Sequence, residues 1–189
     1  MYRMAALLAS RSLPGPADPG EVARIAGAST MSAGPLGAFL DGEDVTSLIR
    51  TSELGEAASM LSACPPVRRA MVAKQREAAA GRDIVAEGRD MGTVVFPDAV
   101  LKVYITADIA VRGIRRMRDL PRRSGVRPCE VLVDVVEGLM KRDARDRERP
   151  DSPLRRASDA CLLDTSAMSV AEQVERVVAL FRAAGGRGA

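Results

Sequence analysis

Apolar residues recur along this chain at two spacings, and the spacing distinguishes the expected helices from the expected strands. Recurrence every three or four residues predicts helices over residues 1–13, 21–26, 52–62, 67–80, 109–120, 129–149 and 170–181. Short aliphatic runs predict strands over residues 84–86, 100–105 and 160–164. Strands that alternate with helices indicate parallel βαβ units, so we expect an α/β fold with helices on both faces of a parallel sheet.

Capping residues and apolar stripes define these helices further. Thr51 and Asp108 are the expected N-caps of two helices, and Ser169 with Glu172 forms a capping box for the last one. The stripes expected to be buried are Val131, Val135 and Leu139 in the long helix, and Val170, Val174, Val177, Val178 and Phe181 in the last helix.

Residues 27–46 break the helical pattern into short pieces separated by turn residues. The run 37–40 leads directly into Asp41-Gly42, a dipeptide typical of tight hairpins. We therefore expect a small antiparallel insertion here, outside the parallel sheet.

The composition excludes several kinds of chemistry. The chain has no histidine and only three widely spaced cysteines, so imidazole catalysis, the usual zinc sites and a disulfide framework are not expected. No apolar run is long enough to span a bilayer. We therefore expect a cytoplasmic protein without a membrane partner.

The charge balance gives little support to nucleic-acid binding. The 28 basic residues exceed the 25 acidic ones by only three, and aromatic residues, which stack on bases, make up 3% of the chain. Residues 112–156 are rich in arginine, so an RNA-binding protein remains an alternative, but the acids interleaved with these arginines argue against it. We expect no nucleic-acid partner.

Two glycines bracket an arginine and an aspartate in the run Gly88-Arg89-Asp90-Met91-Gly92, directly after the expected strand at 84–86. Ligands of open α/β sheets bind beyond the carboxyl ends of the strands, which makes Arg89 and Asp90 candidate ligand contacts. A turn with a solvated ion pair is the alternative interpretation.

A second candidate lies in the long helix, where Arg142, Asp146 and Arg149 follow the i, i+4, i+7 spacing of one helical face. Two guanidiniums beside a carboxylate can hold an anion while the carboxylate orders the arginines or accepts from hydroxyls. The alternative is a solvated face of ion pairs. Together with the basic loop 122–128, these groups suggest a nucleotide or a sugar phosphate as ligand.

The run 88–97 closely resembles the signature of bacterial cytidylate kinases, which are nucleoside-monophosphate kinases. Further similar segments occur in the family's order and extend the resemblance over nearly all of the chain: 1–3, 41–45, 49–51, 142–146, 152–154 and 159–165. The resemblance implies a P-loop kinase-like fold, and transfer of the γ-phosphoryl group of ATP to CMP or dCMP with Mg²⁺. It also implies small-molecule substrates only, and we expect a monomer.

The resemblance implies a role for each candidate residue. Asp90 and Arg50 would recognise cytosine, which agrees with a carboxylate accepting from the N4 amino group. Arg3, Arg89 and Arg149 would hold the CMP phosphate, while Arg142 and Asp146 would bind the ribose or nearby phosphate oxygens. The arginines expected to act catalytically, by neutralising the charge of the transferred group, are Arg122, Arg123, Arg127 and Arg142.

The resemblance also suggests how the chain is organised. Residues 1–189 are expected to form a single domain, in which about 20–63 make up a CMP-binding insertion and about 116–128 a helical lid.

The sequence departs from the family at one point. The family begins with a strand and a G-x-x-x-x-G-K-S/T loop that holds the ATP phosphates, and none of Lys74, Lys102 and Lys141 lies in such a loop. We therefore expect that the sequence starts at an internal methionine and lacks this first strand, the loop and its residues for ATP. Such a chain would be poorly stable and lack useful ATP affinity; an inactive CMP-binding remnant is the alternative.

Overall fold

In the computed structural model, residues 1–13, 15, 18–119 and 128–185 are described. They form two compact units, which are considered separately below. Unit 1 comprises Met1–Gly88 and Arg149–Ser152, and unit 2 comprises Arg89–Glu148 and Pro153–Ala189. Within the described ranges, no helix combines the length and the apolar character needed to cross a membrane.

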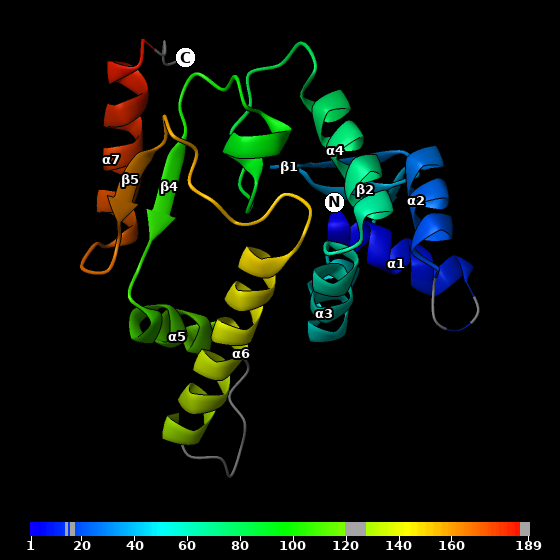
Figure 1. Cartoon of the computed structure of the whole chain (residues 1–189), viewed down its shortest axis with the longest axis horizontal. Coiled ribbons are helices and arrows are strands. Elements are labelled where there is room, and N and C mark those ends of the chain that lie inside the picture. The colour runs from blue at the N-terminus through cyan, green and yellow to red at the C-terminus, as the bar shows by residue number, and fades with distance from the viewer. Residues whose placement is uncertain (14, 16–17, 120–127, 186–189) are drawn as a thin grey trace. The chain divides into compact units, whose positions relative to one another are not determined.

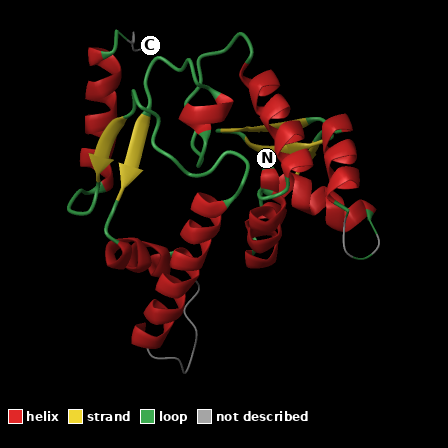
Figure 2. Ribbon diagram, viewed as in Figure 1, coloured by secondary structure: helices red, strands yellow, loops and turns green. Residues whose placement is uncertain are grey.

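Unit 1 combines helices with a small antiparallel sheet (Figures 1 and 2). Its helices are α1 (Tyr2–Ser12), α2 (Pro19–Ala28), the 3₁₀ turn η1 (Leu48–Arg50), α3 (Ser52–Leu61) and α4 (Pro65–Ala79). Its sheet has the order β1-β2-β3, formed by Met31–Gly34, Gly37–Leu40 and Glu43–Asp44. Residues of α1, α2, β2 and α4 contribute to its hydrophobic core, which includes Met4, Leu7, Val22, Leu40, Val67 and Met71.

The hairpin turn and the helix cap predicted for unit 1 are confirmed. Asp41 and Gly42 join β2 to β3 with φ angles of 49° and 86°, the left-handed conformation that a tight hairpin turn requires. Thr51 caps α3 by accepting a hydrogen bond from the Leu54 amide. The predicted antiparallel insertion and the predicted helices of this region are therefore present.

Unit 2 contains the parallel pairing predicted from alternating strands and helices. Strand β4 (Val103–Thr106) pairs in parallel with β5 (Cys161–Asp164). The helices are α5 (Ile109–Arg118), α6 (Pro128–Glu148) and α7 (Val170–Ala183), and a π-helical turn, η2, spans Met91–Val95. Asp108 caps α5, and Ser169 with Glu172 forms the expected capping box of α7. The α/β class is confirmed.

The strand predicted over residues 84–86 is wrong. These residues form an irregular segment, and the side chains of Ile84 and Val85 are exposed. A short aliphatic run has a strand's composition, but it becomes a strand only when a neighbouring strand supplies hydrogen-bond partners. In the described part of the chain, no strand pairs with this segment.

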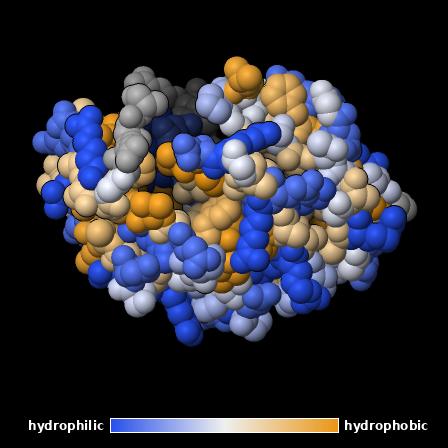
Figure 3. Space-filling model, turned by 90° about the horizontal axis from the view of Figure 1, so that it is seen from above, coloured by the Kyte–Doolittle hydropathy of each residue, from blue (hydrophilic) through white to orange (hydrophobic). Residues whose placement is uncertain are grey.

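The predicted stripes mark helices correctly but overstate burial. Val131, Val135 and Leu139 of α6 are only half-buried. In α7, Val170, Val174, Val178 and Phe181 are exposed, Val170 by 76%. Figure 3 shows apolar side chains among the polar ones on the surface in view. Helical periodicity identifies an apolar face, whereas burial of that face also needs a packing partner.

Helices α5 and α6 approach each other closely at Gly113. A β-carbon there would lie 2.7 Å from Val136 Cγ2 and 3.0 Å from Leu132 Cδ1. The first distance is too short for real atoms, and a β-branched side chain has little freedom to move away in a helix. Gly113 therefore permits the contact between the two helices.

We predict that Gly113→Ala lowers the free energy of unfolding by about 1–2 kcal/mol, because overpacking outweighs the gain in helix propensity. Gly138→Ala in α6 is the matched control: its added methyl group meets nothing within 4 Å. The control should stabilise by about 0.5–1 kcal/mol. Urea denaturation measures both, and equal stabilisation by the two substitutions would contradict the close contact.

Candidate functional site

Arg89 and Asp90 lie on a well-ordered turn rather than in a solvated loop. The Asp90 carbonyl accepts hydrogen bonds from the amides of Thr93, Val94 and Val95 at 3.3, 2.9 and 3.2 Å, which starts the π-helical turn η2. The Asp90 residue is only 5% exposed. Turns of this type are frequent at functional sites. Asp90 is buried rather than solvated, and Arg89 pairs with Asp146, so the two do not form an exposed pair with each other.

Gly92 of the same turn is needed for close packing. A β-carbon on Gly92 would lie 3.2 Å from Cδ of Lys102, whose aliphatic stem covers the turn. The Lys102 ammonium group in turn pairs with Asp159 at 2.6 Å. The second glycine of the Gly88-Arg89-Asp90-Met91-Gly92 run therefore makes room for a side chain from the segment before β4.

Two buried carboxylates on α6 each form an ion pair with an arginine, and the two arginines come from different elements of unit 2. Asp143 accepts two hydrogen bonds from Arg112 of α5, from Nη1 at 2.5 Å and from Nη2 at 3.0 Å. Asp146, one turn further along, lies 3.0 Å from Nε of Arg89. The helix α6 is thus connected by ion pairs both to α5 and to the turn that carries Asp90.

The Arg112 hydrogen bonds dominate the electrostatics of Asp143. They lower the pKa of its carboxyl group against the opposing effect of burial, and the charges of Arg112, Arg89 and Arg147 act in the same direction. The carboxylate correspondingly raises the pKa of Arg112. Asp143 is therefore held in its ionised form at neutral pH.

The expected face of Arg142, Asp146 and Arg149 is only partly present. Asp146 is buried, whereas Arg142 is exposed on α6. The helix ends at Glu148, so Arg149 does not continue its periodicity and belongs to unit 1. The seven-residue spacing assumed that the helix continues through Arg149.

In unit 1, Arg3 is fixed close to the segment that contains Arg50. Nη1 of Arg3 donates to the carbonyl oxygens of Ile49 at 2.7 Å and Thr51 at 3.0 Å, the residues on either side of Arg50. A β-carbon on Gly55 would lie 2.9 Å from Nη2 of Arg3, so this glycine leaves space for the guanidinium. Arg50 itself is exposed at the end of η1.

Arg149 is held in unit 1 by a short turn. Its Nε donates to the Ser152 carbonyl at 2.6 Å, and Ser152 has a φ of 49°. Next to it, Asp151 lies 4.0 Å from Nε of Arg68, a side chain only 2% exposed that also donates to the Ser62 carbonyl. Sequence reasoning missed Arg68, although its signal was an arginine beside the apolar positions Val67 and Met71 of a helix.

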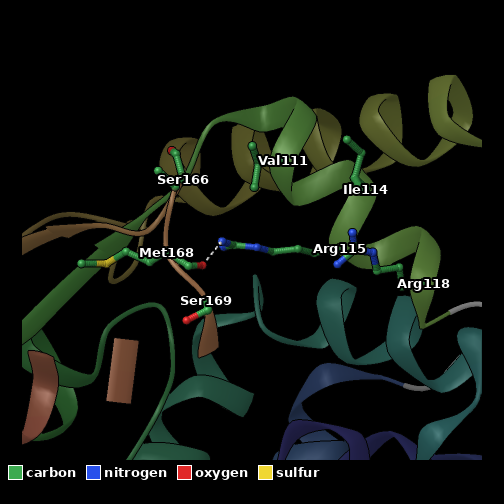
Figure 4. A pocket seen from close by; sticks show the side chains of 8 residues that line it. Val111, Ile114, Arg115, Arg118, Ser166, Met168 and Ser169 are labelled. Atoms are coloured by element: carbon green, nitrogen blue, oxygen red, sulfur yellow. Dashed lines mark hydrogen bonds between the residues drawn. The ribbon is translucent and has the colours of Figure 1, made fainter. Parts of the chain in front are cut away.

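A pocket of about 360 Å³ opens between α5 and the loop 166–169 before α7 (Figure 4). Val111 and Ile114 give it an apolar side, and Arg115 extends across it. Arg115 donates to the carbonyls of Thr165 at 2.5 Å and Met168 at 3.2 Å. An apolar wall with a few fixed polar groups is typical of sites for small organic ligands. Sequence reasoning did not identify this pocket.

Other expected site features are not visible in the described residues. Arg122, Arg123 and Arg127 fall outside these residues, as does most of the expected lid, so their roles stay predictions. No group of three or more acidic, cysteine or histidine side chains in the described part of the chain is arranged to hold a metal ion.

Parallel strands, paired arginines and an apolar pocket are together consistent with a kinase-like α/β protein. The sequence profile of the family "Cytidylate kinase" matches residues 1–183. The cytidylate kinase of Paraburkholderia phymatum is 42% identical over 183 residues, 97% of this chain and 79% of the relative. That of Burkholderia thailandensis is 40% identical over 185 residues, 98% of this chain and 80% of the relative. That of Burkholderia cenocepacia is 47% identical over 148 residues, 78% of this chain and 64% of the relative.

The chain therefore belongs to the cytidylate kinase family and is a kinase, an enzyme of the transferase class. Matches at this level over nearly the whole chain confirm the family predicted from the run 88–97. They do not favour the RNA-binding alternative or the inactive remnant.

The Arg112–Asp143 pair gives a testable pH dependence. Because the pKa of Asp143 is lowered in the folded state, its stabilisation is present above the unfolded pKa of about 3.9 and is lost as the pH falls through the lower folded value. Asp143→Asn should therefore lower the free energy of unfolding by about 1–3 kcal/mol at pH 7. The decrease should become progressively smaller below about pH 4.

Urea denaturation at several pH values between 7 and 2.5 measures this difference. Asp134→Asn, at an exposed position of the same helix, is the control and should change stability little at any pH. A cost of Asp143→Asn that stays constant down to pH 2.5 would contradict the ion pair.

Proposed function

We propose that this protein transfers the γ-phosphoryl group of ATP to CMP or dCMP, giving CDP or dCDP. In this reaction an oxygen of the CMP phosphate forms a bond to the γ-phosphorus, and the bond from that phosphorus to the β–γ bridging oxygen breaks. Membership of the cytidylate kinase family supports the proposal. The observation that carries it is the buried Asp90 carboxylate on the ordered turn of the family-like run 88–97.

Asp90 and Arg50 are proposed to recognise the cytosine base. A carboxylate accepts a hydrogen bond from the N4 amino group of cytosine, whereas uracil presents a carbonyl oxygen at that position and would be repelled. Arg50 would donate to the acceptors of the base. Burial of Asp90 strengthens the discrimination, because an unsatisfied carboxylate is costly where water is excluded.

Arginines that other groups already orient are proposed to bind the CMP phosphate. Backbone carbonyls fix Arg3 and Arg149, and the Asp146 carboxylate fixes Arg89. A guanidinium held in one orientation loses little conformational entropy when it binds a phosphate oxygen. Arg142 and Asp146 are proposed to contact the ribose or the neighbouring phosphate oxygens.

Catalysis is proposed to rest on charge neutralisation rather than on a covalent intermediate. Arg142, with Arg122, Arg123 and Arg127 of the proposed lid at about 116–128, would neutralise the charge on the transferred group. Phosphoryl transfer depends mainly on such positioning and electrostatic stabilisation, so the absence of histidine from the sequence is no obstacle. We propose that the enzyme acts on free nucleotides as a monomer.

The pocket between α5 and the loop 166–169 is proposed to receive the nucleoside of ATP. The apolar side chains Val111 and Ile114 suit a base, and Arg115 supplies positive charge nearby. The described residues offer no protein cage for Mg²⁺. The ion is therefore proposed to arrive on the triphosphate, the way in which Mg²⁺ commonly enters kinase sites.

Asp90→Asn tests the base-recognition role. An asparagine amide can donate as well as accept, so we expect CMP affinity to fall by about tenfold or more and UMP affinity to rise. Asp98→Asn, at an exposed position on the same segment, is the control and should change neither affinity. Isothermal titration with CMP and UMP measures both, and unchanged CMP affinity in Asp90→Asn would refute the role.

We further propose that residues 1–189 bind CMP well and ATP weakly, since the sequence has no G-x-x-x-x-G-K-S/T loop for the triphosphate. We expect ATP affinity on the order of 100-fold below that of the Paraburkholderia phymatum enzyme, since several charge-assisted phosphate contacts are missing. Calorimetry of both proteins tests this, and turnover of CMP by residues 1–189 equal to the relative's would contradict it.

A further inference from the structure

Arg112 and Asp143 have no role in the proposed reaction, yet they form a bidentate ion pair between α5 and α6. Two hydrogen bonds of 2.5 and 3.0 Å join the planar guanidinium to the carboxylate. The Asp143 side chain is 9% exposed and the Arg112 side chain 28%. A bidentate pair fixes the orientation of both groups as well as the distance between them.

The pair lies beside a close approach of the two helices. At Gly113, the next residue after Arg112, an added β-carbon would lie 2.7 Å from Val136 Cγ2 and 3.0 Å from Leu132 Cδ1 of α6. Val111 and Ile114, on either side of this site in the sequence, line the pocket. On α6, Asp143 follows Arg142 directly and precedes Asp146 by three residues, less than one helical turn.

Asp143 and Asp146 are three residues apart and so share one face of α6, and Arg89 pairs with the second of them. Arg89 pairs with Asp146 at 3.0 Å, and its charge also lowers the pKa of Asp143. With Arg112 in place, the Asp143 carboxylate is already neutralised by two hydrogen bonds. Without Arg112, the buried Asp143 carboxylate would lose both of these hydrogen bonds and would compete with Asp146 for Arg89, because a buried charge needs a partner.

We infer that Arg112 and Asp143 are a positioning pair. By forming hydrogen bonds with the Asp143 carboxylate, Arg112 leaves Arg89 paired with Asp146. Arg89 is thereby held in the orientation that binds the acceptor phosphate. The pair acts through Arg89 and touches no substrate. The inference rests on the proposed CMP-binding function of Arg89. A lysine at position 112 would not replace the arginine fully, since an ammonium group cannot form the bidentate contact.

The test compares CMP affinity in single and double variants of the 189-residue chain by isothermal titration calorimetry. Arg112→Ala should weaken CMP binding by about tenfold. In Arg112→Ala/Asp143→Ala, the competing carboxylate is also gone, so most of the lost affinity should return. In an Arg89→Ala background, Arg112→Ala should have no further effect.

Lys141→Ala is the matched control, since Lys141 forms an exposed i, i+4 pair with Glu137 on the same helix and should leave CMP affinity unchanged. Circular dichroism confirms that each variant is folded at the titration temperature. Unchanged affinity in Arg112→Ala overturns the inference. So does a double variant as weak as the single one, because that result would mean simple loss of packing.

A second measurement separates this inference from the proposed function. A double-mutant cycle on stability gives the coupling between Arg89 and Asp146, which should fall in the Arg112→Ala background. If the unaltered chain binds no CMP, the proposed function is wrong, and this coupling still decides the inference. Coupling that is independent of Arg112 overturns it.

Discussion

Unit 2 depends on one constraint: a carboxylate removed from water must have a cationic partner. Helix α6 buries two aspartates, Asp143 and Asp146, less than one turn apart. Each is matched by an arginine from a separate element, α5 for one and the turn at 88–92 for the other. Removing the arginine of such a pair destabilises the fold, because it leaves the buried carboxylate without its partner. The two pairs therefore determine where α6 lies relative to both neighbours, and so where its functional groups are held.

The same principle operates in unit 1 with different groups. There, backbone carbonyls orient Arg3 and Arg149: Arg3 donates to the carbonyls of Ile49 and Thr51, which are distant in sequence, and Arg149 donates to that of Ser152, three residues further on. A guanidinium has five N–H donors, so one or two can fix its orientation while others remain directed elsewhere. Arginines oriented in this way suit the phosphate-binding role that is proposed for Arg3 and Arg149.

Local features were predictable from the sequence, whereas features that need a distant partner were not. The caps Thr51, Asp108 and Ser169 and the Asp41-Gly42 turn act within a few residues, and all are where the sequence places them. The predictions of a strand at 84–86 and of a buried face on α7 were wrong, because a strand and a buried face each need a partner from elsewhere in the chain. For the site, the motif singled out Asp90 and Arg89 as candidate contacts, and their roles stay predictions. It gave no indication of Arg112 or Arg68, whose partners, Asp143 and Asp151, lie far away in sequence.

The short turn Arg149–Ser152 has a consequence for dissecting the protein. It belongs to unit 1, although the chain on both sides of it belongs to unit 2. Unit 1 is therefore discontinuous along the polypeptide. A fragment that ended at Gly88 would keep the helices and the sheet of unit 1 but lose Asp151, the carboxylate 4.0 Å from the buried Arg68. A design that keeps unit 1 whole therefore has to include this four-residue segment as well as the first 88 residues.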